Sequence, residues 1–263
     1  MQIQVNDVVL TVEDRGAGRP LLFIHGYPLS RRLWEPQLEG LADVAYLIAP
    51  DLRGHGDSGS TSGPYSMDLL AEDCHALLDV MGVKEPVVLC GLSMGGYITF
   101  AFYRKYPERV AGLILAATRA GEDSPEGKAN RDKAANLARQ GGPGAIAESM
   151  LPKMLAPKTY NERPELVQSV WEMMHSTSLE GILGDLMGMK SRPDSTPTLK
   201  QIDKHTLILH GSDDQLISLR DAVSMRAATS GAQLRVILDA GHLVNLEQPE
   251  QFNLAIRGFL KEL

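Results

Sequence analysis

The sequence predicts an α/β fold built around a doubly wound, mostly parallel β-sheet. Short apolar runs rich in β-branched residues recur along the chain, and segments with helical periodicity alternate with them. From Leu21 onward the runs are near-continuous, as expected for strands that are buried on both faces of a parallel sheet. The predicted strands are Val8–Val12, Leu21–Ile24, Ala45–Ala49, Val87–Cys90, Val110–Leu115, Thr206–His210 and Leu234–Leu238.

Two helices can be placed between and after these strands. Apolar residues from Leu70 to Met81 follow the i, i+4, i+7, i+8, i+11 spacing of one helical face. Ser66 is expected to cap the start of this helix, and Gly82 is expected to end it. A C-terminal helix is expected to begin near Pro249. Its apolar side consists of Phe252, Ile256, Phe259 and Leu260.

Residues 120–197 interrupt the alternation of strands and helices. The segment contains four helix-like stretches, and no strand-like run appears in it. The predicted helix breaks are Gly141–Gly142, Pro157 and Pro193, and the predicted first helical positions are Pro125 and Pro164. We therefore expect a core of residues 1–119 and 198–263, with residues 120–197 inserted as a helical cap over one end of the sheet.

The overall composition argues against several functional classes. The 263 residues carry a formal charge of −7 without clustered Lys and Arg, so no nucleic-acid partner is expected. No apolar run approaches the roughly 18 residues that span a bilayer, so no membrane insertion is expected. The N-terminus lacks the layout of a signal peptide, and Cys74 and Cys90 form no CxxC pair. These features favour a cytoplasmic protein without a metal site.

A strand–turn–helix motif contains a candidate nucleophile. The segment GLSMGG at residues 91–96 follows the strand Val87–Cys90 and precedes a helical pattern, which is the context in which G-x-S-x-G carries meaning. A serine on such a turn has a strained backbone, so its neighbours at −2 and +2 must be small. Gly91 and Gly95 meet this need. The new helix directs its N-terminal N–H groups at Ser93, where they favour developing negative charge.

Two loops that follow strands supply a candidate base and a candidate acid. A serine hydroxyl needs a base to take its proton, and an acid must hold that base in the right tautomer. His242 follows the strand Leu234–Leu238 and is the candidate base. Asp213 and Asp214 follow the strand Thr206–His210; they cannot both face the imidazole, and Asp214 is favoured. The chain order Ser, Asp, His is the one expected on this fold.

The turn after the strand Leu21–Ile24 is expected to complete an oxyanion site. Residues 25–28, HGYP, follow that strand directly. The backbone N–H of Tyr27 is the expected first donor, and that of Met94 is the second. Loss of one such donor typically raises the barrier by about 2.7–4 kcal/mol. His25 is expected to hold the loop by hydrogen bonds rather than to act as a second base.

The chain resembles the α/β-hydrolase superfamily along essentially its whole length. The resemblance is carried by HGYP (25–28), DLRGHGDSG (51–59), GLSMGG (91–96), LILHGSDD (207–214) and AGHLVNLEQPEQFN (240–253). The chain looks closest to small bacterial carboxylesterases, 3-oxoadipate enol-lactonases and cofactor-free haloperoxidases. The resemblance implies an eight-stranded sheet with a helical cap between strands six and seven. It also implies a catalytic triad of Ser93, Asp214 and His242, and the family's oxyanion residues map onto Tyr27 and Met94.

The substrate pocket is expected between the helical insertion and the carboxyl edge of the sheet. Six of the eleven methionines fall within residues 120–197, where they either fill the insertion's own core or repack around varied apolar groups. The candidate pocket residues are Trp34, Met150, Trp171, Met187 and Val244. Arg119 and Arg192 could bind a carboxylate, but no clear cationic cluster lies near the motifs. This modestly disfavours an enol-lactonase.

Three functions fit these motifs. The leading one is a carboxylesterase that hydrolyses small to medium esters through an acyl-enzyme on Ser93. The second directs the same triad at lactones, or at peracid formation when peroxide replaces water. The third is a ligand receptor on the same fold with slow turnover. No cofactor is expected, because the triad needs no metal and no G-x-G-x-x-G motif follows the first strands.

Overall fold

A single mixed sheet of eight strands forms the centre of the computed structural model, which describes residues 1–263. The strands are β1 (Gln2–Val5), β2 (Val8–Gly16), β3 (Pro20–Ile24), β4 (Tyr46–Pro50), β5 (Val87–Leu92), β6 (Val110–Ala116), β7 (His205–Gly211) and β8 (Gln233–Ile237). Their order is β1-β2-β4-β3-β5-β6-β7-β8. The pairs β1–β2 and β2–β4 are antiparallel, and every pair from β4 to β8 is parallel. The predicted doubly wound, mostly parallel sheet is confirmed.

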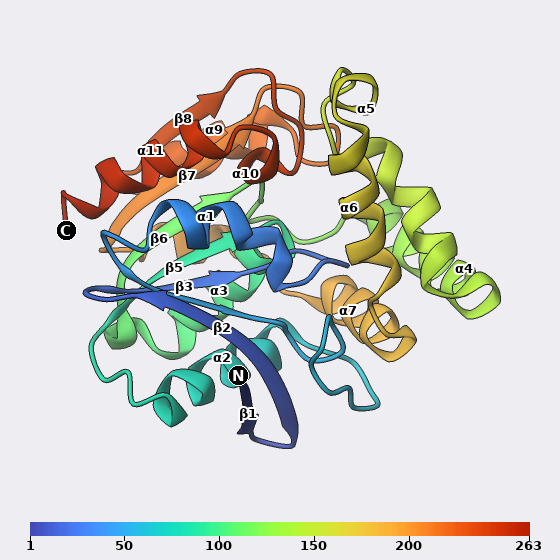
Figure 1. Cartoon of the computed structure of the whole chain (residues 1–263), viewed down its shortest axis with the longest axis horizontal. Helices are drawn as coiled ribbons and strands as arrows, with labels where there is room; N and C mark the ends of the chain where they lie inside the picture. The colour runs from blue at the N-terminus through green and yellow to red at the C-terminus, as the bar shows by residue number, and fades with distance from the viewer.

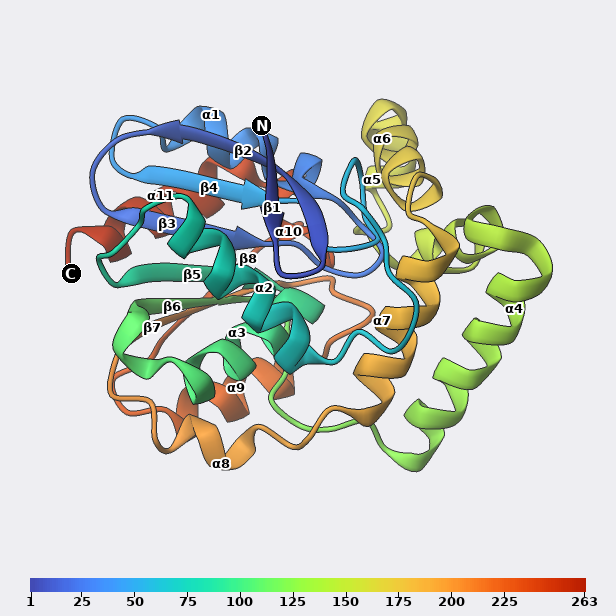
Figure 2. The same ribbon diagram turned by 90° about the horizontal axis from the view of Figure 1, so that it is seen from below.

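Helices cover both faces of the sheet, which explains why its strands are apolar on both sides. In β3, Leu21 and Phe23 belong to one core, and Leu22 and Ile24 belong to the other. The first core lies under α1 (Glu35–Gly40), α10 (Val244–Glu247) and α11 (Pro249–Leu260). The second lies under α2 (Met67–Val80), α3 (Met94–Lys105) and α9 (Leu219–Ala228). The two layers can be followed on either side of the sheet in Figures 1 and 2.

The two helices placed from the sequence are present as α2 and α11. The Ser66 hydroxyl accepts the Leu69 N–H at the start of α2, and Gly82, with φ of +72°, follows its end. Pro249 is the first residue of α11, whose apolar side packs into the core. These helix ends could be predicted from the sequence because capping residues and residues with left-handed backbone act locally.

The connection between β6 and β7 is helical, as expected from the sequence. It contains α4 (Pro125–Met150), α5 (Thr159–Glu162), α6 (Pro164–His175), α7 (Leu179–Ser191) and α8 (Thr196–Leu199). Gly142 was expected to lie at a helix stop; it has φ of 67° and kinks α4 there, with Pro143 starting the second part. Short 3₁₀ turns occupy Arg31–Trp34, Pro107–Arg109 and Leu151–Lys153. No helix of the chain is both long and apolar enough to cross a membrane.

The inserted helices stand beyond the carboxyl ends of the parallel strands. In Figure 2 the arrowheads of β3 and β4 point toward the side of the molecule where α4, α6 and α7 lie. Parallel strands bring the loops that follow them to one edge of a sheet, which is where open α/β sheets bind ligands. The fold therefore gathers the predicted functional loops beneath α4 and α7.

Candidate active site

Ser93 occupies the tight turn between β5 and α3. Its φ of 56° and ψ of −112° lie in a region that non-glycine residues rarely adopt. The turn needs glycine on both sides: a Cβ on Gly95 would lie 2.1 Å from the carbonyl oxygen of Ile24. A Cβ on Gly91 would lie 2.3 Å from the carbonyl oxygen of Gly95. The Thr118 hydroxyl donates to the Ser93 carbonyl at 2.7 Å, so the loop after β6 also holds the strained residue.

The His242 imidazole is hydrogen-bonded to the carboxylate of Asp214. Nδ1 of His242 lies 2.9 Å from Oδ2 and 3.1 Å from Oδ1 of Asp214. The N–H groups of Leu216 and Ile217 donate to Oδ1 at 2.8 and 3.0 Å. Burial favours the neutral carboxyl, but the neighbouring His242 and these hydrogen bonds outweigh it and lower the pKa of Asp214. An ionised Asp214 can thus hold Nδ1 protonated and leave Nε2 free to accept a proton.

The neighbouring carboxylate Asp213 has a different environment. It is exposed, and its closest side-chain partner is the Ser212 hydroxyl at 3.2 Å. The structure therefore places Asp214, the favoured candidate, against the imidazole and leaves Asp213 exposed.

One small cavity has both Ser93 and His242 in its wall. Its volume is about 130 Å³, well below the roughly 300–1,000 Å³ of pockets that bury drug-sized ligands. The other wall residues are Tyr27, Tyr97, Arg119, Arg131, Met150, Met189, Leu216 and Ile217. They come from the loops after β3, β6 and β7 and from α3, α4 and α7, so the cavity lies where the sheet edge meets the inserted helices. Its size favours a small substrate.

Tyr27, whose N–H is one expected oxyanion donor, lines the same cavity as Ser93, and Met94, the other, follows Ser93 in the chain. A Cβ on Gly26 would be 3.3 Å from the Cβ of Ser93, so the turn that contains Tyr27 passes next to the nucleophile. The Tyr27 N–H donates to no other backbone group. Met94 is the first residue of α3, and the first N–H groups of a helix have no intrahelical acceptor. Both N–H groups remain candidate donors to a substrate oxyanion.

His25 has hydrogen bonds that hold the same loop. Its Nε2 accepts the Leu52 N–H at 3.0 Å, and Nδ1 lies 3.0 Å from the Gly26 carbonyl, to which it donates in the matching tautomer. Burial is the main reason that the pKa of His25 is lowered. With both ring nitrogens engaged and the ring fully buried, His25 is not free to act on a substrate.

Of the five predicted pocket residues, Met150 lies in the cavity wall and the other four do not. Trp34 is fully buried and stacks on a phenylalanine of β3, with ring centroids 4.7 Å apart. Val244 is fully buried in the same core. Trp171 stacks on a histidine one turn further along α6. Met187 is 37% exposed and lines a separate groove between α4 and α7. Packing in the core takes Trp34 and Val244 away from the site, stacking within α6 takes Trp171 away, and Met187 belongs to another groove.

The expectation that no cationic cluster lies near the motifs is wrong. Arg119 and Arg131 both line the cavity, and the buried carboxylate of Asp123 brings them together. Of the two arginines that were considered as carboxylate ligands, Arg119 lines the cavity, whereas Arg192 pairs with Asp123 but does not line it. Sequence analysis missed this arrangement because the arginines lie on separate elements. Tyr97 was also missed, although its position four residues after Ser93 on α3 places it one turn above the nucleophile.

Glu247 connects the loop of His242 to the inserted helices. Its buried carboxylate accepts the N–H of Gly241 at 2.6 Å, the N–H of Ala156 at 2.8 Å and the hydroxyl of Thr159 at 2.6 Å. Burial raises the pKa of Glu247, although the three hydrogen bonds favour its ionised form. Glu247 therefore positions the residue before His242 from the side of the insertion.

Replacing Glu247 with Gln is expected to destabilise the protein by about 1.5–3 kcal/mol, because an amide NH₂ would face buried donors. We also expect turnover at Ser93 to fall about tenfold, since His242 loses a fixed neighbour. Urea unfolding and steady-state kinetics measure the two effects. Glu250→Gln, an exposed change on α11, is the matched control. Equal effects of the two variants would contradict the positioning role.

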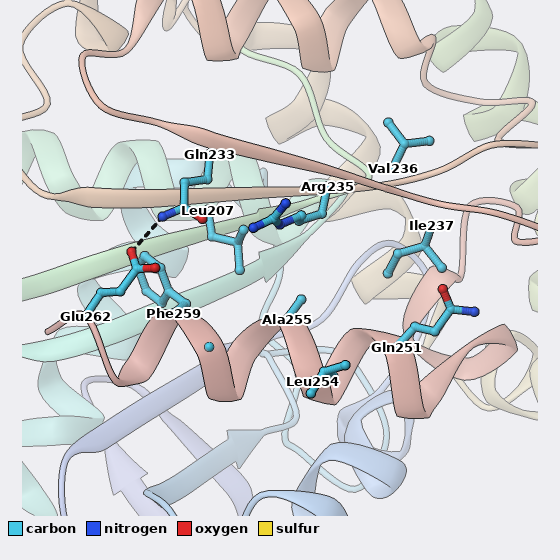
Figure 3. A pocket seen from close by; sticks show the side chains of 11 residues that line it. Leu207, Gln233, Arg235, Val236, Ile237, Gln251, Leu254, Ala255, Phe259 and Glu262 are labelled. Atoms are coloured by element: carbon cyan, nitrogen blue, oxygen red, sulfur yellow. Dashed lines mark hydrogen bonds between the residues drawn. The ribbon is translucent and has the colours of Figure 1, made fainter.

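A groove of about 360 Å³ between β8 and α11 is larger than the cavity at Ser93 but contains none of the predicted functional residues. Figure 3 shows its wall, where Nε2 of Gln233 donates to Oε2 of Glu262 at 2.6 Å. The chain also has no group of three or more His, Cys, Asp or Glu side chains arranged to hold a metal ion. The chemistry-bearing residues thus converge on the smaller cavity.

The topology of the sheet and the serine at the turn after β5 place the protein in a class of hydrolases. The family model described as alpha/beta hydrolase fold matches residues 19–249, and the chain belongs to this family. The resemblance stated from the motifs is confirmed.

Similar proteins include esterases and enol-lactonases. The 3-oxoadipate enol-lactonase 2 of Acinetobacter baylyi is 30% identical over 261 residues, which cover 98% of this chain and 96% of that protein. A solved structure of a thermophilic esterase from Thermogutta terrifontis with malate bound has a TM-score of 0.96 and 41% identity, covering 100% of this chain and 98% of that one. The enol-lactonase from Burkholderia xenovorans LB400 has a TM-score of 0.93 and 25% identity, covering 99% and 100%.

Proposed function

We propose that the protein is a serine carboxylesterase that hydrolyses small to medium carboxylic esters through an acyl-enzyme on Ser93. The observation that carries the proposal is a single cavity whose wall contains a strained Ser93 and the imidazole that is bonded to Asp214. Similarity to an esterase along the whole chain supports it. Residues 120–197 act in this proposal as a cap that closes the cavity over the substrate.

The proposed reaction uses these groups in turn. His242 Nε2 takes the hydroxyl proton of Ser93 as Oγ attacks the ester carbonyl carbon. The N–H groups of Tyr27 and Met94 stabilise the resulting oxyanion. The tetrahedral intermediate collapses to the acyl-enzyme, and His242 delivers its proton to the leaving alcohol. A water activated by the same imidazole then releases the acid and restores Ser93.

Lactones are a second candidate substrate class. Opening a lactone ring needs the same attack by Ser93, the same stabilisation of an oxyanion and the same proton transfers. The difference is that the leaving alcohol remains attached to the acyl group. Similarity to an enol-lactonase over 98% of this chain favours this candidate. Comparing turnover of enol-lactones and simple esters by the purified protein separates the two classes.

The proposal is tested by hydrolysis of p-nitrophenyl esters of increasing acyl length and by titration with diethyl p-nitrophenyl phosphate. We expect turnover with an optimum at short chains, as the small cavity suggests. The phosphate should release one equivalent of p-nitrophenol and abolish turnover, and mass spectrometry should find the diethylphosphoryl group on Ser93. Labelling of another residue, or activity that survives full labelling, would overturn the proposal. Tight ester binding without turnover would support a receptor.

A further inference from the structure

Three arginines surround one buried carboxylate beside the cavity. Asp123 has a side chain that is 1% exposed, and its Oδ1 pairs with Arg119 of the loop after β6. Its Oδ2 lies 3.0 Å from Nε of Arg131 on α4, and its Oδ1 lies 2.9 Å from Nη1 of Arg192, which follows α7. Three positive charges and one negative charge leave this group with an excess of two positive charges. The carboxylate of Asp123 therefore does not neutralise the charge of the three arginines.

Two of the three arginines share the cavity wall with Ser93. The side chains of Arg119 and Arg131 are 30% and 24% exposed, and both line the cavity. Arg192 is 3% exposed and has its guanidinium 4.1 Å from the centre of the Tyr97 ring, so it acts as a buried support. Arg119 and Arg131 thus border the space in which a substrate would lie.

No fixed anion in the wall neutralises these two arginines. The wall contains no Asp or Glu, and Asp123 lies behind it. Asp185 on α7 is the other carboxylate close enough to influence Arg131, but it is fully buried and lies 3.0 Å from Nε2 of His55. A guanidinium binds a carboxylate through two parallel N–H···O bonds, which are stronger than neutral hydrogen bonds. A ligand carboxylate is the chemical group that fits the open positions.

We propose that Arg119 and Arg131 bind a free carboxylate of the substrate. The preferred substrates are then small esters or lactones that carry an ionised carboxylate in addition to the ester or lactone group. This inference rests on the proposed function of Ser93. Because the cavity is only about 130 Å³, the carboxylate and the reacting carbonyl belong to one short molecule. The arginines select this molecule by charge, and Ser93 attacks its ester group.

The preference is measured with monomethyl esters of dicarboxylic acids from succinate to adipate. Each is paired with the methyl ester whose terminal carboxylate is replaced by a carboxamide of the same size, and hydrolysis is followed by pH-stat titration. For at least one chain length, kcat/KM should favour the half ester over the amide by about 10- to 100-fold. Equal rates for every pair would overturn the inference. If diethyl p-nitrophenyl phosphate still labels Ser93, the proposed function remains standing.

Variants assign the preference to the two side chains. Arg119→Gln and Arg131→Gln should each lower the half-ester-to-amide ratio by about 10- to 100-fold, chiefly through KM, and Arg119→Lys should retain part of it. Arg139→Gln removes the same charge from an exposed position on α4 and should leave the ratio unchanged. Parallel loss of activity on both substrates, with an unchanged ratio, would identify Arg119 and Arg131 as structural residues.

A binding measurement keeps the inference testable if turnover is absent. Calorimetry with the Ser93→Ala variant should show that the favoured half ester binds about 10- to 100-fold more tightly than its amide. The double variant Ser93→Ala/Arg119→Gln should lose that difference. Equal affinity of the Ser93→Ala variant for the two compounds would refute carboxylate recognition whether or not the wild type hydrolyses esters.

Discussion

Replacing Ser93 with alanine is expected to lower kcat for ester hydrolysis by about 10⁴- to 10⁶-fold. The acyl-enzyme cannot form without Oγ, and only substrate binding and the oxyanion donors remain, which sustain a small residual rate over water. The fold should persist, since Ala introduces no atom that Ser lacks. Steady-state hydrolysis of p-nitrophenyl acetate, with circular dichroism as a check of folding, measures the effect. An alanine variant that retains a tenth of the wild-type rate would show that another residue is the nucleophile.

Ser93→Gly is the matched variant for the backbone at this position. Both variants lack Oγ and should be equally inactive, but they differ in how they tolerate a φ of 56°. Glycine adopts positive φ without the steric conflict that Cβ causes, and such strain amounts to about 1–3 kcal/mol. Urea unfolding should therefore show the glycine variant to be about 1 kcal/mol more stable than the alanine variant. A less stable glycine variant would indicate that the turn stores little strain.

The sheet and the candidate triad were predictable because both follow from short-range signals combined with one topological rule. Apolar runs marked seven of the eight strands, and the loops after them had to meet at one edge of the sheet. The strand β1 was missed because it is a four-residue edge strand in which only Val5 is buried. The expectation of an eighth strand came only from the resemblance to the family.

The lining of the cavity was not predictable in the same way. Trp34 was placed there because it follows the oxyanion loop, but the space under α1 and α11 accommodates the ring and buries it completely. Arg119 was considered as a carboxylate ligand but not as part of a cluster, and Arg131 was overlooked, because each looks like an ordinary surface arginine in its own segment. Arg119 and Arg131 lie close together because both pair with Asp123, which depends on how the inserted helices pack on the sheet. Local patterns carry no information about that arrangement.

Asp214→Asn is expected to lower kcat by about 10⁴-fold while leaving the turn around it intact. The amide oxygen can still accept the N–H groups of Leu216 and Ile217. Its NH₂ group, however, would donate to Nδ1 of His242, which places the imidazole proton on Nε2 and removes the base that Ser93 needs. Asp213→Asn makes the same charge change at the exposed neighbour and should leave kcat within about twofold. Equal losses in the two variants would mean that local charge, rather than the carboxylate on the imidazole, supports catalysis.

The same pair of variants tests the lowered pKa of Asp214. A carboxyl whose folded-state pKa lies below its ordinary value of 3.8 contributes stability above that value, and the contribution is lost as the pH falls through the lowered pKa. The free energy of unfolding should therefore differ between wild type and Asp214→Asn at pH 6, and the difference should shrink as the pH is lowered below 3.8. Asp213→Asn should show no comparable change. A stability gap for Asp214→Asn that stays constant down to pH 2–3 would mean that the ionised carboxylate gains nothing from its contacts in the folded protein, and that its role is confined to orienting His242.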